Sequence, residues 1–494
     1  MRPVMDNLFL DVYYFFVPSR ILYDKFVNVF GENTESAWAN ATEYQVPTVS
    51  AGTSVPSGSV GDYLGLPVGM ALSEDISVLP FRAFAKIYDD WFRDQNNVSP
   101  MHIQTGETST SEAFNSNAWA PNNYFGKLPK VAKMHDYFTS CLPAPQKGDA
   151  VDLPLGNVKD VPVYSGVEIP SNIAGSSPMH FGRSTGDIFP NGAGTYNMGI
   201  SVALPGNKYA DAVFASNSSA SAPASAGLIP TNLWSRTSDI GLENVTINDL
   251  RFAFQYQKML ERDARSGTRF VEYLLSHFGV SAGDYRLQRS EFLGGRRTPI
   301  SIHQVNQTTG SDDSKSPLGS VGAYSLSSGM SRYTKGFTEN GYVIGVCCIR
   351  QFHSYQQGIE RFWTRSKRTD FYDPVFSHIG EQPVYKTELF ASAEKGVPFG
   401  YNEAWADLRS RPAKVTAQMR TGATDSYDFW HFADYYANAP TLSATFIEET
   451  PDYVDRAITV SSDSSNQFLL DFYVNNIAYR VLPTYSIPSL IDHD

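Results

Sequence analysis

The sequence predicts a mainly β protein, an antiparallel sandwich or barrel with a few helices in the connections between strands. Charged residues make up only 18% of the 494 residues and aromatic residues 13%, a balance typical of chains that bury large contact surfaces. The 37 glycines and 29 prolines supply many turns. Strand-like segments outnumber helical ones and show no regular strand–helix alternation, which favours an antiparallel architecture.

The N-terminal part predicts one strand and two helices. Residues 7–17 (NLFLDVYYFFV) are rich in aromatic and β-branched side chains, which indicates a strand. Residues 19–33 have helical periodicity and a stop at Gly31. Residues 79–96 predict an amphipathic helix with an aromatic stripe. This stripe either binds a partner or, as we prefer, packs on the protein's own sheet.

The middle of the chain differs in composition from both ends. Residues 150–240 are dominated by Gly, Ser, Ala, Asn and Pro, and they far exceed an ordinary loop in length. We interpret them as a surface insertion. The first part of the β core, with helical connections, then occupies residues 1–149. Residues 241–494 carry helices and the rest of the core.

The C-terminal part predicts two helices followed by strands. Residues 245–279 give the strongest helical signal, with Thr246 as N-cap, a second start near Thr268 and a stop at Gly279. Strand-like segments follow at 299–305, 341–353, 383–392, 413–420 and 467–482.

Three cysteines are too few for a disulfide scaffold. Cys347 and Cys348 are adjacent in a predicted strand, so they point to opposite faces, and we expect two small, buried, reduced side chains. The chain shows no signal peptide and no apolar run of about 20 residues, so we expect no membrane insertion.

Motifs for catalysis or cofactor binding are missing from the sequence. It contains no P-loop, nucleophile elbow, HExxH or CxxC pattern. The adjacent Glu448 and Glu449 would face opposite ways on a strand, unlike an acid/base pair. Residues 491–494 (IDHD) are a weak cation-binding pattern, and a solvated or interface tail is favoured. We therefore expect no catalytic residue, no cofactor and no metal site.

Basic residues cluster in three stretches, although the net charge is −12. The stretches are residues 286–297, 350–368 and 409–420, and Phe362 and Trp363 lie within the second. Basic side chains interleaved with aromatic rings are typical of single-stranded nucleic-acid binding, whereas interface Arg residues that pair with acids are the equally weighted alternative. The candidate residues are Arg350, Arg361, Arg365, Lys367, Arg368, Arg409, Arg411, Lys414 and Arg420.

Several long and uncommon segments match one family in the same order along the chain. They include residues 3–22, 260–280, 286–295, 336–350, 354–365, 371–385, 399–420 and 480–494. Examples are LERDARSGTRFVEYLLSHFGV, GFTENGYVIGVCCIR and RVLPTYSIPSLIDHD. Together these segments resemble the major capsid protein of the Microviridae, in particular its gokushovirus branch.

The resemblance implies an eight-stranded antiparallel jelly-roll barrel with long insertions. It implies a T=1 icosahedral shell of 60 copies that encloses a circular single-stranded DNA genome. Further expected partners are viral DNA-binding, scaffolding and pilot proteins and a bacterial host receptor. The location would be the virion, after assembly in the host bacterial cytoplasm.

Within that resemblance, three regions acquire expected roles. Residues 150–240 would form protrusions at the threefold axes and serve in host attachment. Residues 350–368 are the first candidate for the DNA-facing surface, and residues 409–420 are the second. In the C-terminal tail, apolar residues are expected to pack on a neighbouring subunit or on the base of the barrel: Tyr485, Ile487, Leu490 and Ile491.

The chain departs from the family pattern at its start. Related chains usually carry several dozen residues before the PVMDN motif, so we expect an internal start or a truncated sequence, with an uncovered sheet edge.

Two other function classes fit the composition about as well, and the family resemblance places them behind. A secreted β-sandwich carbohydrate-binding protein should show a signal peptide. A glycoside hydrolase needs two carboxylates in one cleft, and no motif places them there.

Overall fold

A computed structural model describes most of the chain. The described residues are 6–32, 43–107, 112–151, 247–306, 308, 319, 321–458, 461–463, 466–480 and six short strands between 164 and 234. The protein is mainly β, with some helices. It divides into two compact units, the first formed by Met1–Gly148 and Leu260–Asp494 and the second by Asp149–Met259.

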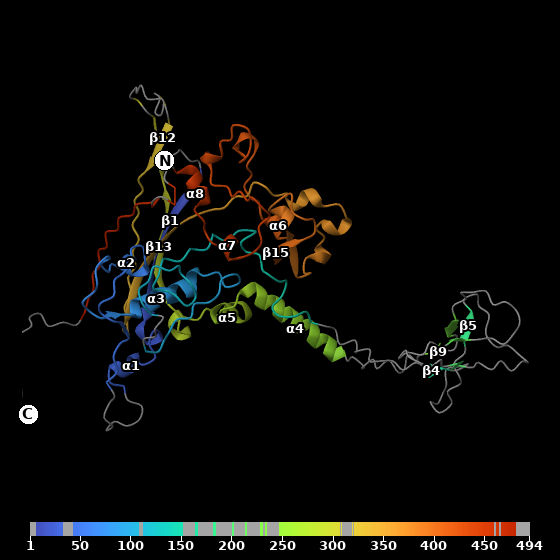
Figure 1. Cartoon of the computed structure of the whole chain (residues 1–494), viewed down its shortest axis with the longest axis horizontal. Coiled ribbons are helices and arrows are strands. Elements are labelled where there is room, and N and C mark those ends of the chain that lie inside the picture. Colours follow the sequence, from blue (N-terminus) through green and yellow to red (C-terminus); the bar gives the residue numbers. More distant parts are fainter. Residues whose placement is uncertain are drawn as a thin grey trace, which may run out of the picture. The chain divides into compact units, whose positions relative to one another are not determined.

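A three-stranded antiparallel sheet forms the centre of the first unit. Strand β1 (Leu8–Pro18) lies between β10 (Glu291–Ile300) and β13 (Gly341–Gln351), as Figure 1 shows in part. The predicted strand at 7–17 is confirmed, and so is the predicted strand at 341–353. A bulge between Tyr14 and Phe15 shifts the pairing of β1 with β10.

Helix α3 (Leu79–Ile87) continues into a π turn at Tyr88–Phe92 and covers one face of this sheet. Its buried side chains pack against Phe15 of β1 and Ile344 of β13 in one apolar cluster. Period-2 alternation on the strands and helical periodicity on α3 bring the two apolar faces together. The preferred interpretation of the aromatic stripe, packing on the protein's own sheet, is confirmed.

The remaining elements of the first unit are short. Its other strand pairs are β2 (Thr48–Val49) with β3 (Ile76–Ser77), β11 (Ile302–Asn306) with β12 (Val321–Ser325), and β14 (Glu381–Tyr385) with β15 (Pro398–Glu403). Its short helices are α1 (Phe26–Val29), α2 (Val60–Tyr63), α6 (Ala406–Arg409), α7 (Ala444–Ile447) and α8 (Asp452–Ala457).

Four predicted elements are wrong or shortened. The strand expected at 383–392 ends at Tyr385, where β14 gives way to a 3-10 turn, Lys386–Glu388. The helix expected at 19–33 is reduced to a 3-10 turn, Ser19–Ile21, and to α1. Residues 413–420 hold only a 3-10 turn, Ala417–Met419, because no neighbouring strand offers them hydrogen bonds. The described residues of the predicted strand at 467–482 likewise form no strand.

The strongest helical signal is confirmed by two helices, α4 (Ile247–Ser266) and α5 (Phe270–Phe278). Helix α5 ends at Gly279, whose φ of +68° is the left-handed cap that glycine favours. The expected N-cap, Thr246, lies outside the described residues.

In the second unit, six short strands pair antiparallel in a nested order. They are β4 (Tyr164–Ser165) with β9 (Leu233–Trp234), β5 (Phe181–Arg183) with β8 (Leu228–Pro230), and β6 (Ile200–Ser201) with β7 (Val213–Phe214). The first strand pairs with the last, the second with the fifth and the third with the fourth, as in one long hairpin. Residues 150–240 fall within this unit, and their role as a surface insertion stays a prediction.

All three cysteines are free thiols. The expectation that Cys347 is buried is wrong, because this side chain is exposed on the sheet face opposite to α3. Among the described helices, none combines the length and apolar character needed to cross a membrane.

Candidate nucleic-acid-facing groove

A groove of about 560 Å³ brings two of the three predicted basic stretches together. One wall comes from residues 355–365 and the other from residues 407–420, with Tyr137, Phe138 and Glu388 completing the lining. The third stretch, residues 286–297, lies elsewhere, at the start of β10. Folding therefore concentrates basic side chains that are about 50 residues apart in the sequence.

Three of the groove's basic side chains are held by acids of the same chain. The guanidinium of Arg361 lies 2.8 Å from Glu388 and that of Arg365 lies 2.6 Å from Asp407. The ammonium of Lys414 lies 2.5 Å from Glu360. These ion pairs form within one subunit and not across a subunit contact, so the choice between the two interpretations stays a prediction.

Two further groove residues have charges without an acidic partner. Arg420 donates a hydrogen bond to the backbone oxygen of Gln356 at 3.2 Å. Arg411 is exposed and, like the neighbouring Lys367 and Arg368 outside the groove lining, forms no ion pair within the part of the chain that the structure describes. These side chains are available for an external anion.

The two remaining candidates lie away from the groove lining. Arg409 is exposed and pairs with Glu403 at 2.8 Å. Arg350 of β13 and Arg297 of β10 both form ion pairs with the carboxylate of Asp11 on β1. The N···O distances are 2.5 Å for Arg350 and 2.7 Å for Arg297. Burial alone would raise the pKa of Asp11, but hydrogen bonds from the two guanidinium groups hold that pKa below its ordinary value. These ion pairs therefore link β1 to both of its neighbours in the sheet, β10 and β13.

Aromatic rings add a stacking surface to the groove. The ring centroids of Phe362 and Trp363 are 4.6 Å apart, and Trp363 is 72% exposed. The ammonium of Lys414 lies 5.7 Å from the centre of the Phe362 ring. An exposed ring beside cations is the arrangement on which an unpaired nucleobase stacks while its phosphate is neutralised.

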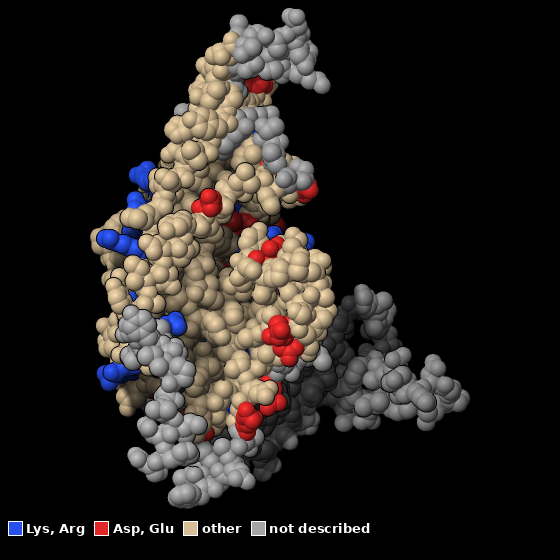
Figure 2. Space-filling model, turned by 90° about the vertical axis from the view of Figure 1, so that its left-hand side faces the viewer, with Lys and Arg blue, Asp and Glu red and all other residues tan. Residues whose placement is uncertain are grey.

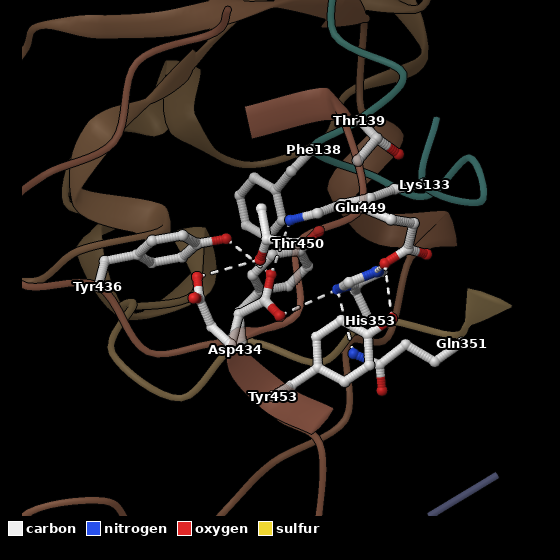
Figure 3. Close-up of polar contacts among 12 residues, drawn as sticks. Lys133, Phe138, Thr139, Gln351, His353, Asp434, Tyr436, Glu449, Thr450 and Tyr453 are labelled. Atoms are coloured by element: carbon white, nitrogen blue, oxygen red, sulfur yellow. Dashed lines mark hydrogen bonds and ion pairs between the residues drawn. The ribbon is translucent and has the colours of Figure 1, made fainter. Parts of the chain in front are cut away.

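A buried polar network lies directly behind the groove wall (Figure 3). His353, just after β13, contacts Asp434 through Nδ1 at 2.9 Å and Glu449 through Nε2 at 3.0 Å. Lys133 also binds Asp434, at 3.0 Å, and Tyr436 donates to the same carboxylate at 2.8 Å. The next segment, at Tyr355, lines the groove, so this network fixes the position of the wall.

The network keeps its histidine charged. Burial alone would lower the pKa of His353, but the hydrogen bonds that it donates to Asp434 and Glu449 outweigh burial and raise the pKa to about 9. Burial would raise the pKa of Asp434, yet its contacts with His353 and Lys133 lower it to about 2. At neutral pH this is a set of fixed charges and not a proton-transfer site.

The acidic side chains that line the groove are neutralised by basic neighbours. Its lining carboxylates, Glu360, Glu388 and Asp407, are each paired with a basic side chain. Among the described residues, no group of three or more His, Cys, Asp or Glu side chains is arranged to hold a metal ion.

The sequence pattern missed the acids that define the groove. Glu388 and Asp407 are 27 and 42 residues from their arginine partners, too far apart for a local pattern. The interface candidates Tyr485, Ile487, Leu490 and Ile491 lie outside the described residues.

Comparison with known proteins gives one consistent result. The model of a family described as "Capsid protein (F protein)" matches residues 1–490. The chain is 38% identical over 500 residues to the capsid protein VP1 of Spiroplasma virus 4, covering 99% of this chain and 86% of that protein. It is 37% identical over 538 residues to the VP1 of Chlamydia phage 1, with 99% and 88% covered. It is 36% identical over 500 residues to the VP1 of Bdellovibrio phage phiMH2K, with 99% and 86% covered.

Proposed function

We propose, from the premise that the chain belongs to the capsid protein (F protein) family, that 60 copies form a T=1 shell around a circular single-stranded DNA genome. The chain is a major capsid protein of the Microviridae, similar to those of gokushoviruses, and is a structural protein of the virion and not an enzyme. The observation that carries the proposal is the family match over 490 residues.

The surface of the subunit supports a role in assembly. On the face drawn in Figure 2, most side chains are uncharged, and the basic ones gather along one side and the acidic ones mostly along the other. Interfaces are depleted of charge at their centres, so a surface of this kind suits burial against neighbours. An eight-stranded jelly roll, with residues 150–240 as the threefold protrusion used in host attachment, is part of the same proposal.

Electron microscopy of the purified chain tests the shell. Closed particles of one diameter with 60 subunits are the expected result. A monomer that stays monodisperse, with and without viral scaffolding and DNA-binding proteins, would contradict self-association into a shell.

We further propose the groove as the DNA-facing surface. Its support is the exposed Trp363 near basic side chains that form no ion pair with any described residue, chiefly Arg411 with the nearby Lys367 and Arg368. In a shell whose subunits each carry −12, these positive charges are concentrated at one place. Assembly inside the host bacterium, together with DNA-binding, scaffolding and pilot proteins, completes the proposal.

The test removes the available charges and leaves the internal ion pairs intact. The triple variant Lys367→Gln, Arg368→Gln and Arg411→Gln should form shells that contain less DNA, measured by the ratio of absorbance at 260 and 280 nm. Trp363→Ala should act in the same direction through lost stacking, worth about 1–3 kcal/mol per base.

A matched control removes three exposed lysines elsewhere, by Lys127→Gln, Lys130→Gln and Lys395→Gln. It has the same net charge as the test variant and should package normally. Normal DNA content in the test variant, with failed assembly, would instead make these residues part of a subunit interface.

A further inference from the structure

The segment before the C-terminal tail is an apolar arm that is largely exposed. We define the arm as residues 469–479 (LLDFYVNNIAY), which contain no proline. Leu469, Tyr473 and Tyr479 are 95%, 91% and 95% exposed. The arm has no helix or strand assigned and follows α8 as the stretched red chain of Figure 1.

Side chains of this kind are not left in water by a stable protein. Apolar surface is driven out of water, and a contiguous exposed apolar segment marks an interaction site. In an extended chain, Leu469, Tyr473 and Ile477 point to one side, and Phe472 and Val474 point to the other. Both faces of the arm therefore carry apolar side chains, as in a strand that is covered on both sides.

The central sheet offers an open edge that matches the arm. β13 is hydrogen-bonded to β1 on one side, and within the described residues no strand pairs with its other side. β13 is 11 residues long, and the arm also has 11 residues. From Gly341 to Ile349 the strand contains neither charge nor proline.

The opposite edge of the sheet, β10, is protected against the addition of a further strand. This leaves β13 as the edge to which a strand can add. β10 carries Arg296, Arg297 and Pro299 and is distorted by the bulge opposite Tyr14 and Phe15. Charges, proline and bulges are the devices that prevent a further strand from adding to an edge. β13 lacks all three along most of its length, so it is the edge open to β-addition.

We propose that the arm of one copy of this chain adds as a strand to the β13 edge of a neighbouring copy. The arm's root, Phe468, packs in its own copy against the cluster of Leu8 and Phe432, and the exposed residues leave from there. Every copy then donates one arm and accepts one, and a single chain can build a continuous shell. This inference rests on the proposed shell function and identifies a contact that links neighbouring subunits.

The exposed thiol of Cys347 on β13 provides the test. A donor version of the chain carries Cys347→Ser and Cys348→Ser, an affinity tag, and one arm cysteine from Leu469→Cys, Tyr473→Cys or Ile477→Cys. The acceptor version keeps Cys347 and has no arm cysteine. Both are co-expressed and mildly oxidised, and products are separated on a non-reducing gel.

A disulfide-linked donor–acceptor heterodimer is expected, strongest for the one arm position that lies opposite Cys347, because cross-strand neighbours have Cβ atoms close enough to bridge. Val343→Lys in the acceptor should abolish most of that product, since it charges the edge strand. Val305→Lys on β11 is the matched control and should leave the product unchanged; the two valines are 39% and 49% exposed.

Two results would overturn the exchange of arms. One is a disulfide that forms only when both cysteines are on the same chain, since the arm would then close on its own sheet. The other is the absence of heterodimer at all three arm positions.

Microscopy of the same samples separates the two proposals. Shells without heterodimer overturn arm exchange and leave the shell function standing. Heterodimer without shells keeps arm exchange and contradicts shell formation by this chain.

Discussion

Arg82 is a completely buried charge at the centre of the first unit. Its guanidinium forms two hydrogen bonds with Glu112, at 2.7 and 2.8 Å, and a third with the backbone oxygen of Leu22. Tyr124 donates to the same carboxylate at 2.6 Å. Such a pair contributes little net stability while intact, but it makes the loss of either partner costly.

Replacing Arg82 by Ala should therefore destabilise the chain by about 3–5 kcal/mol, because Glu112 would stay buried without its cation. Urea unfolding of the soluble subunit measures this difference. The matched variant Arg20→Ala breaks a half-exposed pair with Glu339 and should cost less than about 1 kcal/mol. Equal losses in the two variants would contradict the account of Arg82.

Because of His353, the free energy of unfolding should decrease as the pH rises into the alkaline range. Its pKa is about 9 in the folded chain and about 6.5 when unfolded, so folding favours the protonated form. Its contribution is complete below about pH 6.5 and is lost as the pH rises through about 9. The fall should be on the order of a few kcal/mol, measured by urea unfolding at a series of pH values.

His353→Gln should flatten this alkaline dependence, whereas His303→Gln, at an exposed position on β11, should leave it unchanged. An identical pH dependence in the wild type and in His353→Gln would refute the role of the buried histidine.

At the scale of elements, one glycine lets the 355–365 wall of the groove approach the segment of Glu388 closely. A Cβ at Gly358 would overlap the backbone oxygen of Glu388, the residue that holds Arg361. This close approach requires a residue without a side chain.

Gly358→Ala should push the segment of Glu388 away, lower the melting temperature and weaken DNA packaging together. Gly336→Ala has open space around its Cβ and serves as the control. A Gly358→Ala variant that melts and packages like the wild type would show that the segments of Gly358 and Glu388 can separate freely.

Some secondary-structure elements could be predicted from local sequence patterns alone. Residues 79–92 and 247–278 form helices where periodicity predicts them, since helical hydrogen bonds are made within the segment itself. Residues 413–420 and 467–480 have strand-like composition but form no strand in the subunit. A strand needs hydrogen bonds from a second segment, and composition does not state whether one is present.

At the scale of the whole molecule, the chain divides into two compact units. Residues 149–259 form the second unit, and the central sheet, the groove and the arm belong to the first. A shell built through the first unit should tolerate changes in the second.

We predict that replacing residues 166–227 by a short Gly-Ser linker leaves shells closed but removes the threefold protrusions and adsorption to host cells. Cryo-electron microscopy and an adsorption assay measure the two effects. The control keeps residues 166–227 and inserts the same linker beside Lys395, at an exposed site outside the second unit. Loss of closed shells in the replacement variant alone would place residues 166–227 in assembly.

The sequence by itself determined the mainly β class, strand β1, the long helices with the stop at Gly279, and the segments that resemble capsid proteins. These features depend on local periodicity and on short sequence segments, which can be recognised without knowledge of the tertiary structure. Only the tertiary structure decided that residues 355–365 and 407–420 share a groove, and that Glu388 and Asp407 neutralise part of its charge. Those facts depend on contacts between distant segments, and their energies come from burial and pairing that no local pattern encodes.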